Sequence, residues 1–101
     1  MARAKRRYAA LGDFLDGYLH QDFRSEHRDA LGAARAYARA ASETERKRVA
    51  ADLRRWLTNS RGKLASEWRA DLGSIGGAWQ APSLAAIEML LGIIAPESAG
   101  P

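Results

Sequence analysis

The chain has 101 residues, of which 47% are hydrophobic and 28% are charged, and its formal net charge is +4 at neutral pH. This composition is typical of one folded domain and not of a disordered chain, and the absence of cysteine excludes disulfides and thiolate-bound metals. The longest apolar run, residues 87–94, is too short to span a bilayer, and no apolar segment follows the basic N-terminus as in a signal peptide, so we expect a cytoplasmic protein.

The excess positive charge is concentrated at the N-terminus. Four of the sixteen Lys and Arg residues lie within residues 1–7, and the remaining twelve balance the twelve Asp and Glu residues. Most of the charged side chains in residues 8–29 are acidic, and most of those in residues 30–70 are basic. We therefore expect one surface of the protein to be negative and another to be positive. We predict a disordered basic arm at residues 1–7, a single helical domain at residues 8–95 and a loose tail at residues 96–101.

The first half of the chain carries three helical patterns. Aromatic and leucine side chains recur at three- and four-residue steps over residues 7–20, which predicts an amphipathic helix. A second, alanine-rich helix begins at a cap formed by Ser25 or Asp29. The sequence SETE at residues 42–45 has the form of a capping box and predicts a third helix, which should end near residues 58–62.

The second half adds two shorter helices. Leu64, Ala65, Trp68 and Leu72 predict a fourth helix that ends at Gly73, and residues 73–83 form the longest irregular segment. Ser83 can cap a last helix that ends before Pro96. Because no segment alternates with the period of a strand, the predicted fold class is all-α, a compact bundle of four to five short helices.

The segment GYLHQDF, residues 17–23, gathers polar side chains at the predicted end of the first helix. A metal site is disfavoured, because His20 and His27 are seven residues apart whereas helical ligand pairs are three or four apart. A histidine at this place can instead donate to the last carbonyls of the helix. We therefore favour a structural role for His20.

Catalytic and cofactor motifs are also missing from the sequence. No nucleophile motif such as GxSxG is present, and the glycines at residues 73–77 lack the Lys-Ser/Thr pair of a phosphate-binding loop, so a flexible turn is the better interpretation. We expect no enzyme activity, no catalytic residue, no cofactor and no metal.

The motif resembles that of a known family. The end of the aromatic-rich first helix resembles a recurrent motif in the small immunity proteins of contact-dependent growth inhibition systems. The residues that carry this resemblance are Gly17, Tyr18, His20, Gln21, Asp22 and Phe23. An Ala-rich helix, a helix opened by Ser and Glu, and a short C-terminal helix extend the likeness over about residues 11–94. The resemblance implies a cytoplasmic protein that binds and neutralises a cognate toxin domain by occlusion, without catalysis and without a membrane partner.

The charge pattern suggests where such a toxin binds. An acidic surface suits a nuclease, which presents Lys and Arg to phosphates, and aromatic residues dominate binding hot spots. The candidate toxin-binding residues are Asp13, Asp16, Tyr18, Asp22, Glu26 and Trp79.

The alternative function is a small basic helical nucleic-acid-binding protein. It would use the N-terminal arm and the Arg-rich third helix, which together with the turn at residues 58–62 and the fourth helix has a helix-turn-helix outline. The fourth helix carries Glu67 and Asp71 beside Lys63 and Arg69, and carboxylates repel phosphates. Nucleic acid is therefore the less favoured partner.

Overall fold

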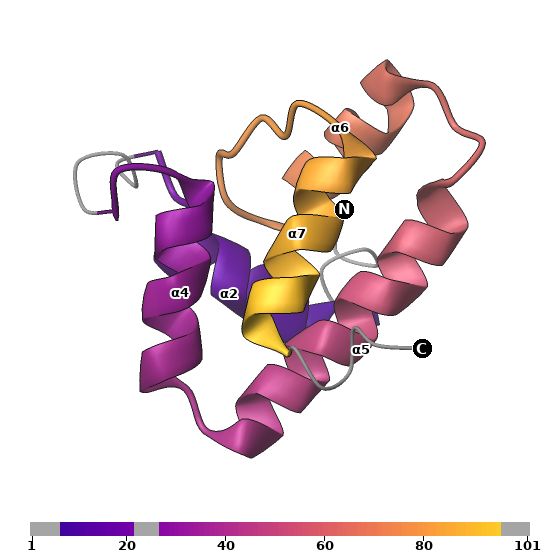
Figure 1. Ribbon diagram of the computed structural model, residues 1–101. Coiled ribbons are helices and arrows are strands. Elements are labelled where there is room, and N and C mark those ends of the chain that lie inside the picture. Colours follow the sequence, from indigo (N-terminus) through magenta and orange to yellow (C-terminus); the bar gives the residue numbers. More distant parts are fainter. Residues whose placement is uncertain (1–6, 22–26, 96–101) are drawn as a thin grey trace.

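The computed structural model describes residues 7–21 and 27–95, which form five α-helices and no strand (Figure 1). The helices are α2 (Ala9–Tyr18), α4 (Ala30–Ala40), α5 (Glu43–Ser60), α6 (Ala65–Ile75) and α7 (Leu84–Ile94). The predicted all-α fold is confirmed, and the Cα radius of gyration of 12.4 Å is that of a compact chain of this length. The predicted tail, and the predicted basic arm except Arg7, lie outside the described residues.

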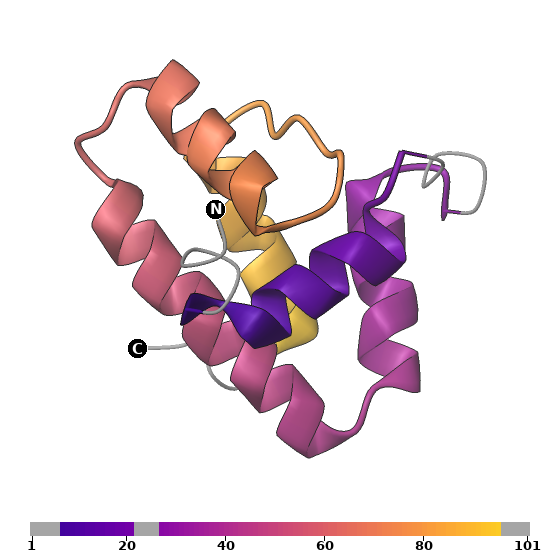
Figure 2. The same cartoon turned by 180° about the vertical axis from the view of Figure 1, so that it is seen from behind.

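The helices cover one another on two faces. α4 and α5 are joined by a short connection, α2 crosses one face of this pair, and α7 lies on the opposite face (Figures 1 and 2). α6 packs against the α2 side. The largest fully buried apolar side chains come from α2, α5, α6 and α7, together with Leu19: Leu11, Phe14, Leu15, Leu19, Leu53, Trp56, Ile75, Ile87, Leu90 and Ile94.

Local capping signals fix the starts of three helices. Ser42 Oγ accepts the Glu45 N–H at 3.1 Å, and Glu45 Oε1 accepts the Ser42 N–H at 3.2 Å, so the predicted capping box of α5 is confirmed. Asp29 caps α4 by accepting the Gly32 N–H at 2.7 Å, whereas the other candidate, Ser25, lies outside the described residues. Ser83 caps α7 as predicted.

The predicted bounds of α6 were wrong at both ends. Leu64 was predicted to belong to the helix, but it is the residue before the first turn and its side chain is 70% exposed. The helix also continues past Gly73 to Ile75, which is fully buried. Burial of an isoleucine side chain contributes about 1.5–3 kcal/mol, which exceeds the cost of about 1 kcal/mol for a glycine inside a helix.

α7 is the most apolar helix of the described chain, and its eleven residues bury Ile87, Leu90, Leu91 and Ile94. A segment of that length reaches only about halfway across the hydrocarbon core of a bilayer. Among the described residues, no helix combines the length and the apolar character that a membrane span requires.

Candidate functional site

A groove is lined in part by residues of α2, the helix that lies toward the viewer in Figure 2. It has a volume of about 360 Å³ and is bounded by α2, α4 and the first turns of α5. We call it the acidic groove and define it by six of its lining residues: Asp13, Phe14, Tyr18, Tyr37, Glu45 and Arg48. Two of the predicted toxin-binding residues, Asp13 and Tyr18, therefore lie together.

Aromatic rings form one wall of the acidic groove. Phe14 and Tyr18, one turn apart on α2, have ring centroids 5.9 Å apart, and Tyr37 meets both rings edge to face at 4.9 and 5.3 Å. His27, which precedes α4, stacks on Tyr18 at 5.8 Å. Such ring pairs stabilise packing beyond the area that they bury, so this cluster joins the end of α2 to α4.

The polar groups of the groove differ in how they are held. Asp13 is exposed and makes no hydrogen bond or ion pair with the described residues, whereas Glu45 is held by the capping box. Tyr37 is only 7% exposed, and burial, with the Glu45 carboxylate as the next cause, raises the pKa of its phenol from 10.0 to about 12. The phenol is therefore neutral at physiological pH, and Asp13 supplies an unpaired negative charge.

Asp16 has a structural contact that the sequence did not reveal. Its Oδ1 accepts the backbone N–H of Gly77 at 2.8 Å, and the Leu19 carbonyl accepts the N–H of Ala78 at the same distance. The loop after α6 is thereby held against the C-terminal end of α2. Asp16 was predicted as a toxin-binding residue. Its carboxylate already holds the loop after α6, and any contact with a toxin would be additional to this hydrogen bond.

Two glycines allow the loop to approach α2 this closely. A Cβ atom at Gly77 would lie 2.9 Å from the Leu15 carbonyl oxygen, and its φ of +71° is unfavourable for other residues. A Cβ at Gly76 would lie 2.8 Å from the Asp16 carboxylate. The prediction of a turn over residues 73–77 was wrong for residues 73–75, which belong to α6, whereas Gly76 and Gly77 leave the helix and pack directly on the end of α2.

The remaining motif residues are spread around this end of α2. Gly17 and Gln21 are exposed, and His20 is half-buried just after the helix. Asp22, Phe23 and Glu26 lie outside the described residues. The proposed role of His20 as a helix-end donor and the motif's role in binding both stay predictions.

Trp79 lies apart from the acidic groove. It is half-buried and lines a second, mostly apolar groove of about 420 Å³, together with Leu31 of α4, Pro82, and Ala86 and Met89 of α7. This groove is on the α7 side of the molecule. The structure therefore separates Trp79 from Asp13 and Tyr18, which the sequence analysis had grouped as one set of candidates.

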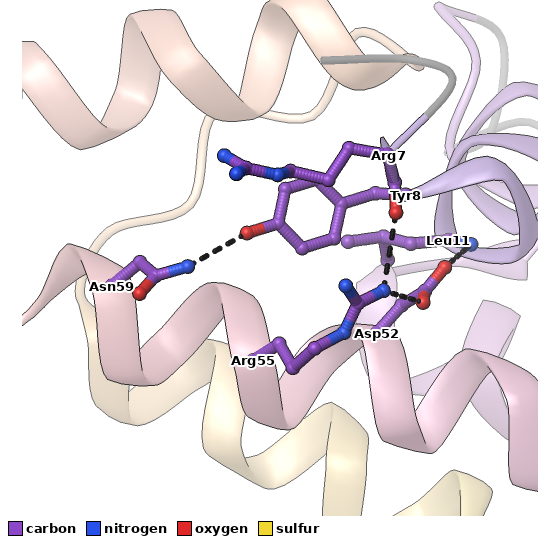
Figure 3. A network of polar contacts seen from close by, with 6 residues as sticks. All are labelled: Arg7, Tyr8, Leu11, Asp52, Arg55 and Asn59. Atoms are coloured by element: carbon purple, nitrogen blue, oxygen red, sulfur yellow. Dashed lines mark hydrogen bonds and ion pairs between the residues drawn. The ribbon is translucent and has the colours of Figure 1, made fainter. Parts of the chain in front are cut away.

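The start of α2 depends on a residue that sequence reasoning missed (Figure 3). Asp52 of α5 is buried, and its Oδ2 accepts the Leu11 N–H at 3.1 Å. This N–H is one of the donors that a helix leaves unpaired at its N-terminus, where the helix dipole also favours a negative charge. Asp52 thus caps α2 from another helix. The only sign of this in the sequence was a carboxylate beside Leu53 and close to Ala50, two apolar residues that are buried in the fold.

Two further α5 side chains complete this contact. Arg55 Nη2 donates to Asp52 Oδ1 at 2.5 Å and to the Arg7 carbonyl at 3.1 Å, and its guanidinium lies 5.1 Å from the Tyr8 ring centroid. Asn59 Nδ2 donates to the Tyr8 hydroxyl at 3.0 Å. Residues at positions 52, 55 and 59 share one side of α5, and together they hold the segment that enters α2 (Figure 3).

Basic side chains of the possible DNA-reading helix are engaged within the protein. Arg69 Nε donates to the Ala81 carbonyl and its Nη2 to the Pro82 carbonyl, each at 2.8 Å. Lys63 lies 4.0 Å from Asp71. The helix-turn-helix interpretation requires these groups to face phosphates, so these contacts weigh against it.

The metal interpretation gains no support from the part of the chain that is described. Within it, no group of three or more His, Cys, Asp or Glu side chains is placed to hold an ion. His20 and His27 are among the described residues, whereas the neighbouring carboxylates of Asp22 and Glu26 are not.

Comparison with known proteins identifies a family. No curated protein and no solved structure matches the chain. The family model described as CdiI immunity protein matches residues 7–76, which is well over half of the sequence and includes α2, α4, α5, α6 and the first of the two glycines that contact α2. The motif at the end of α2, the acidic groove and the cap provided by Asp52 all lie within this match. The chain therefore belongs to the CdiI immunity protein family.

Proposed function

We propose that the chain neutralises its cognate toxin by binding and covering it, and that it catalyses no reaction. The observation that carries this proposal is the family match over residues 7–76, because an immunity protein acts on a toxin. Occlusion is the simplest way for a small helical protein to stop an enzyme, since it needs only a specific surface. We place this encounter in the cytoplasm.

The proposed toxin-binding surface is centred on the acidic groove and the adjoining end of α2. Tyr18 supplies an aromatic side chain that is already held by Phe14 and Tyr37, so little conformational entropy is lost when a partner contacts it. Asp13 supplies an unpaired carboxylate on the same side of α2. Asp16 lies at the adjoining end of α2, Trp79 lines the second groove, and Asp22 and Glu26 lie outside the described residues; all four remain proposed toxin contacts.

The charge of this surface supports a nuclease as the toxin. An enzyme that acts on nucleic acid presents Lys and Arg where phosphates bind, and opposite charges on two partners speed their association. An inhibitor with carboxylates at its binding surface would therefore be captured quickly. Asp13 and Glu45 are the described carboxylates of the groove.

A titration of toxin activity tests occlusion directly. The cognate toxin domain is purified, and its activity is measured while the full chain is added in small steps. Occlusion predicts a linear loss of activity that is complete at an equimolar ratio, together with a stable complex in size-exclusion chromatography. Failure to form a complex, or complete inactivation by a small fraction of an equivalent, would contradict the proposal, because the second result requires turnover.

A further inference from the structure

We propose that the acidic groove receives a Lys or Arg side chain of the toxin, which ion-pairs with Asp13 and lies against the rings of Tyr18 and Tyr37. This inference rests on the proposed function and specifies the chemistry of its central contact. It commits to a basic side chain, and three observations on the groove support that choice.

The first observation is the state of the carboxylates. Asp13 has no partner among the described residues although it lies beside a groove large enough for a side chain. Glu45, held in place by the capping box, adds a second negative charge to the same groove. Arg48 is the opposing charge on the wall, so the groove residues carry two carboxylates against one guanidinium.

The second observation is the aromatic wall. A cation within about 6 Å of a ring centroid is attracted by the ring's electron-rich face. The protein uses this contact twice in its own fold, since Arg55 lies 5.1 Å from the Tyr8 ring and Arg69 lies 4.8 Å from the Trp68 ring. Tyr18 is partly exposed and lines the groove beside the mostly buried Tyr37, so a cation that enters the groove would lie close to tyrosine rings.

The third observation is the Tyr37 hydroxyl. Tyr37 is more than nine-tenths buried and lines the groove, yet its hydroxyl has no hydrogen-bond partner among the described residues. The hydroxyl oxygen is not itself fully buried, so a ligand in the groove can reach it and become its partner. The phenol stays neutral at physiological pH, so its oxygen can accept a hydrogen bond from an ammonium or guanidinium group.

Arg48 makes the competing interpretation testable. If a carboxylate of the toxin entered the groove instead, Arg48 would bind it and the carboxylates would oppose it. The two alternatives therefore predict opposite effects for the same pair of variants. Neutralising Asp13 weakens binding of a cation and strengthens binding of an anion, and neutralising Arg48 does the reverse.

The experiment measures the dissociation constant of the cognate toxin domain for the full-length chain and four variants. For Asp13→Asn we expect weakening by about tenfold or more, the range of a close interfacial charge pair. Tyr37→Phe, which keeps the ring and removes the hydroxyl, should weaken binding by about threefold to tenfold. Arg48→Gln, which removes the positive charge of the groove wall, should tighten binding.

Glu88→Gln is the control for loss of a surface charge, because it neutralises an exposed carboxylate of α7, the helix on the opposite face from α2; this carboxylate pairs with Arg61. It should change the dissociation constant by less than about twofold. Thermal unfolding of each variant checks that the fold is retained. Binding that is unaffected by Asp13→Asn, or that is lost with Arg48→Gln, overturns the inference and leaves the proposed function standing. An absence of binding by the unaltered chain overturns both.

A charge swap then identifies the toxin residue. Each exposed Lys or Arg of the toxin domain is changed to Glu and tested against Asp13→Arg. The inference predicts one position at which the two changes together restore at least part of the affinity that each loses alone. If no position shows this recovery, the ion pair with Asp13 does not exist.

Discussion

The two ends of α2 are held in opposite ways. At the N-terminal end, the carboxylate of Asp52 reaches from α5 to the Leu11 N–H across 41 residues of sequence. At the C-terminal end, backbone N–H groups of the loop after α6 donate to the Asp16 carboxylate and the Leu19 carbonyl, and Gly76 and Gly77 allow the loop to lie this close. The element that packs on α2 supplies a particular side chain at the first end, and at the second end it must lack side chains. The acidic groove lies between them, so its shape depends on both contacts.

Removal of the Asp52 carboxylate should have the largest effect. Asp52→Ala leaves the Leu11 N–H and one side of Arg55 without their partner, and we expect the free energy of unfolding to fall by about 2–3 kcal/mol. Asp52→Asn is the matched control and should lose less, because its amide oxygen can still accept from the Leu11 N–H. Urea denaturation measures both. A loss below about 0.5 kcal/mol for Asp52→Ala would mean that α2 does not depend on this cap.

A methyl group at the other end should have the next largest effect. Gly77→Ala places a Cβ against the Leu15 and Leu19 carbonyls in a backbone conformation that disfavours alanine. We expect a loss of about 2 kcal/mol. Gly73→Ala is the control, because a Cβ there meets nothing within 4 Å and α6 continues through it, so the change should be neutral or slightly stabilising. Equal stabilities of the two variants would show that the loop is free to move away from α2.

These contacts also mark what could be predicted from the sequence. The caps at Asp29, Ser42 and Ser83 were readable because each side chain bonds a backbone N–H three residues ahead. Asp52 and Gly77 act on residues that are 41 and 61 positions away in the sequence, and no local pattern reports such a distance. The end of α6 was wrong for the same reason, since the burial of Ile75 depends on the packed fold.

The residues of the candidate site also differ in how far they could be predicted from the local sequence. Asp13 and Tyr18 could be grouped because both belong to one short amphipathic helix, and they do line one groove. Trp79 follows an irregular segment whose path is set by the contacts of Gly77 and Ala78, so its separate position was not predictable. Arg48 and Tyr37 were missed as groove residues, because three helices must meet before the groove exists.

The burial of Tyr37 in the groove can be tested by measuring stability at alkaline pH. The pKa of Tyr37 is raised from 10.0 to about 12, chiefly by burial, so folding favours the neutral phenol. Its contribution to stability is complete below pH 10 and is lost as the pH rises from 10 toward about 12. The unaltered chain should therefore lose stability more steeply over this interval than Tyr37→Phe, as measured by urea denaturation. Parallel pH profiles would show that Tyr37 is not buried between α2 and α5.

Gly17 should give the smallest effect and the sharpest separation of fold from recognition. It is exposed near the end of α2, and a Cβ there meets nothing within 4 Å. Gly17→Ala should stabilise the helix by up to about 0.5 kcal/mol, since alanine loses less conformational freedom. Because the fold does not require this glycine, a variant that is more stable and yet binds the toxin more weakly would assign Gly17 to the interface, where a partner approaches the backbone closely. A variant that is less stable would instead place a neighbour against Gly17, and the motif would then serve the fold.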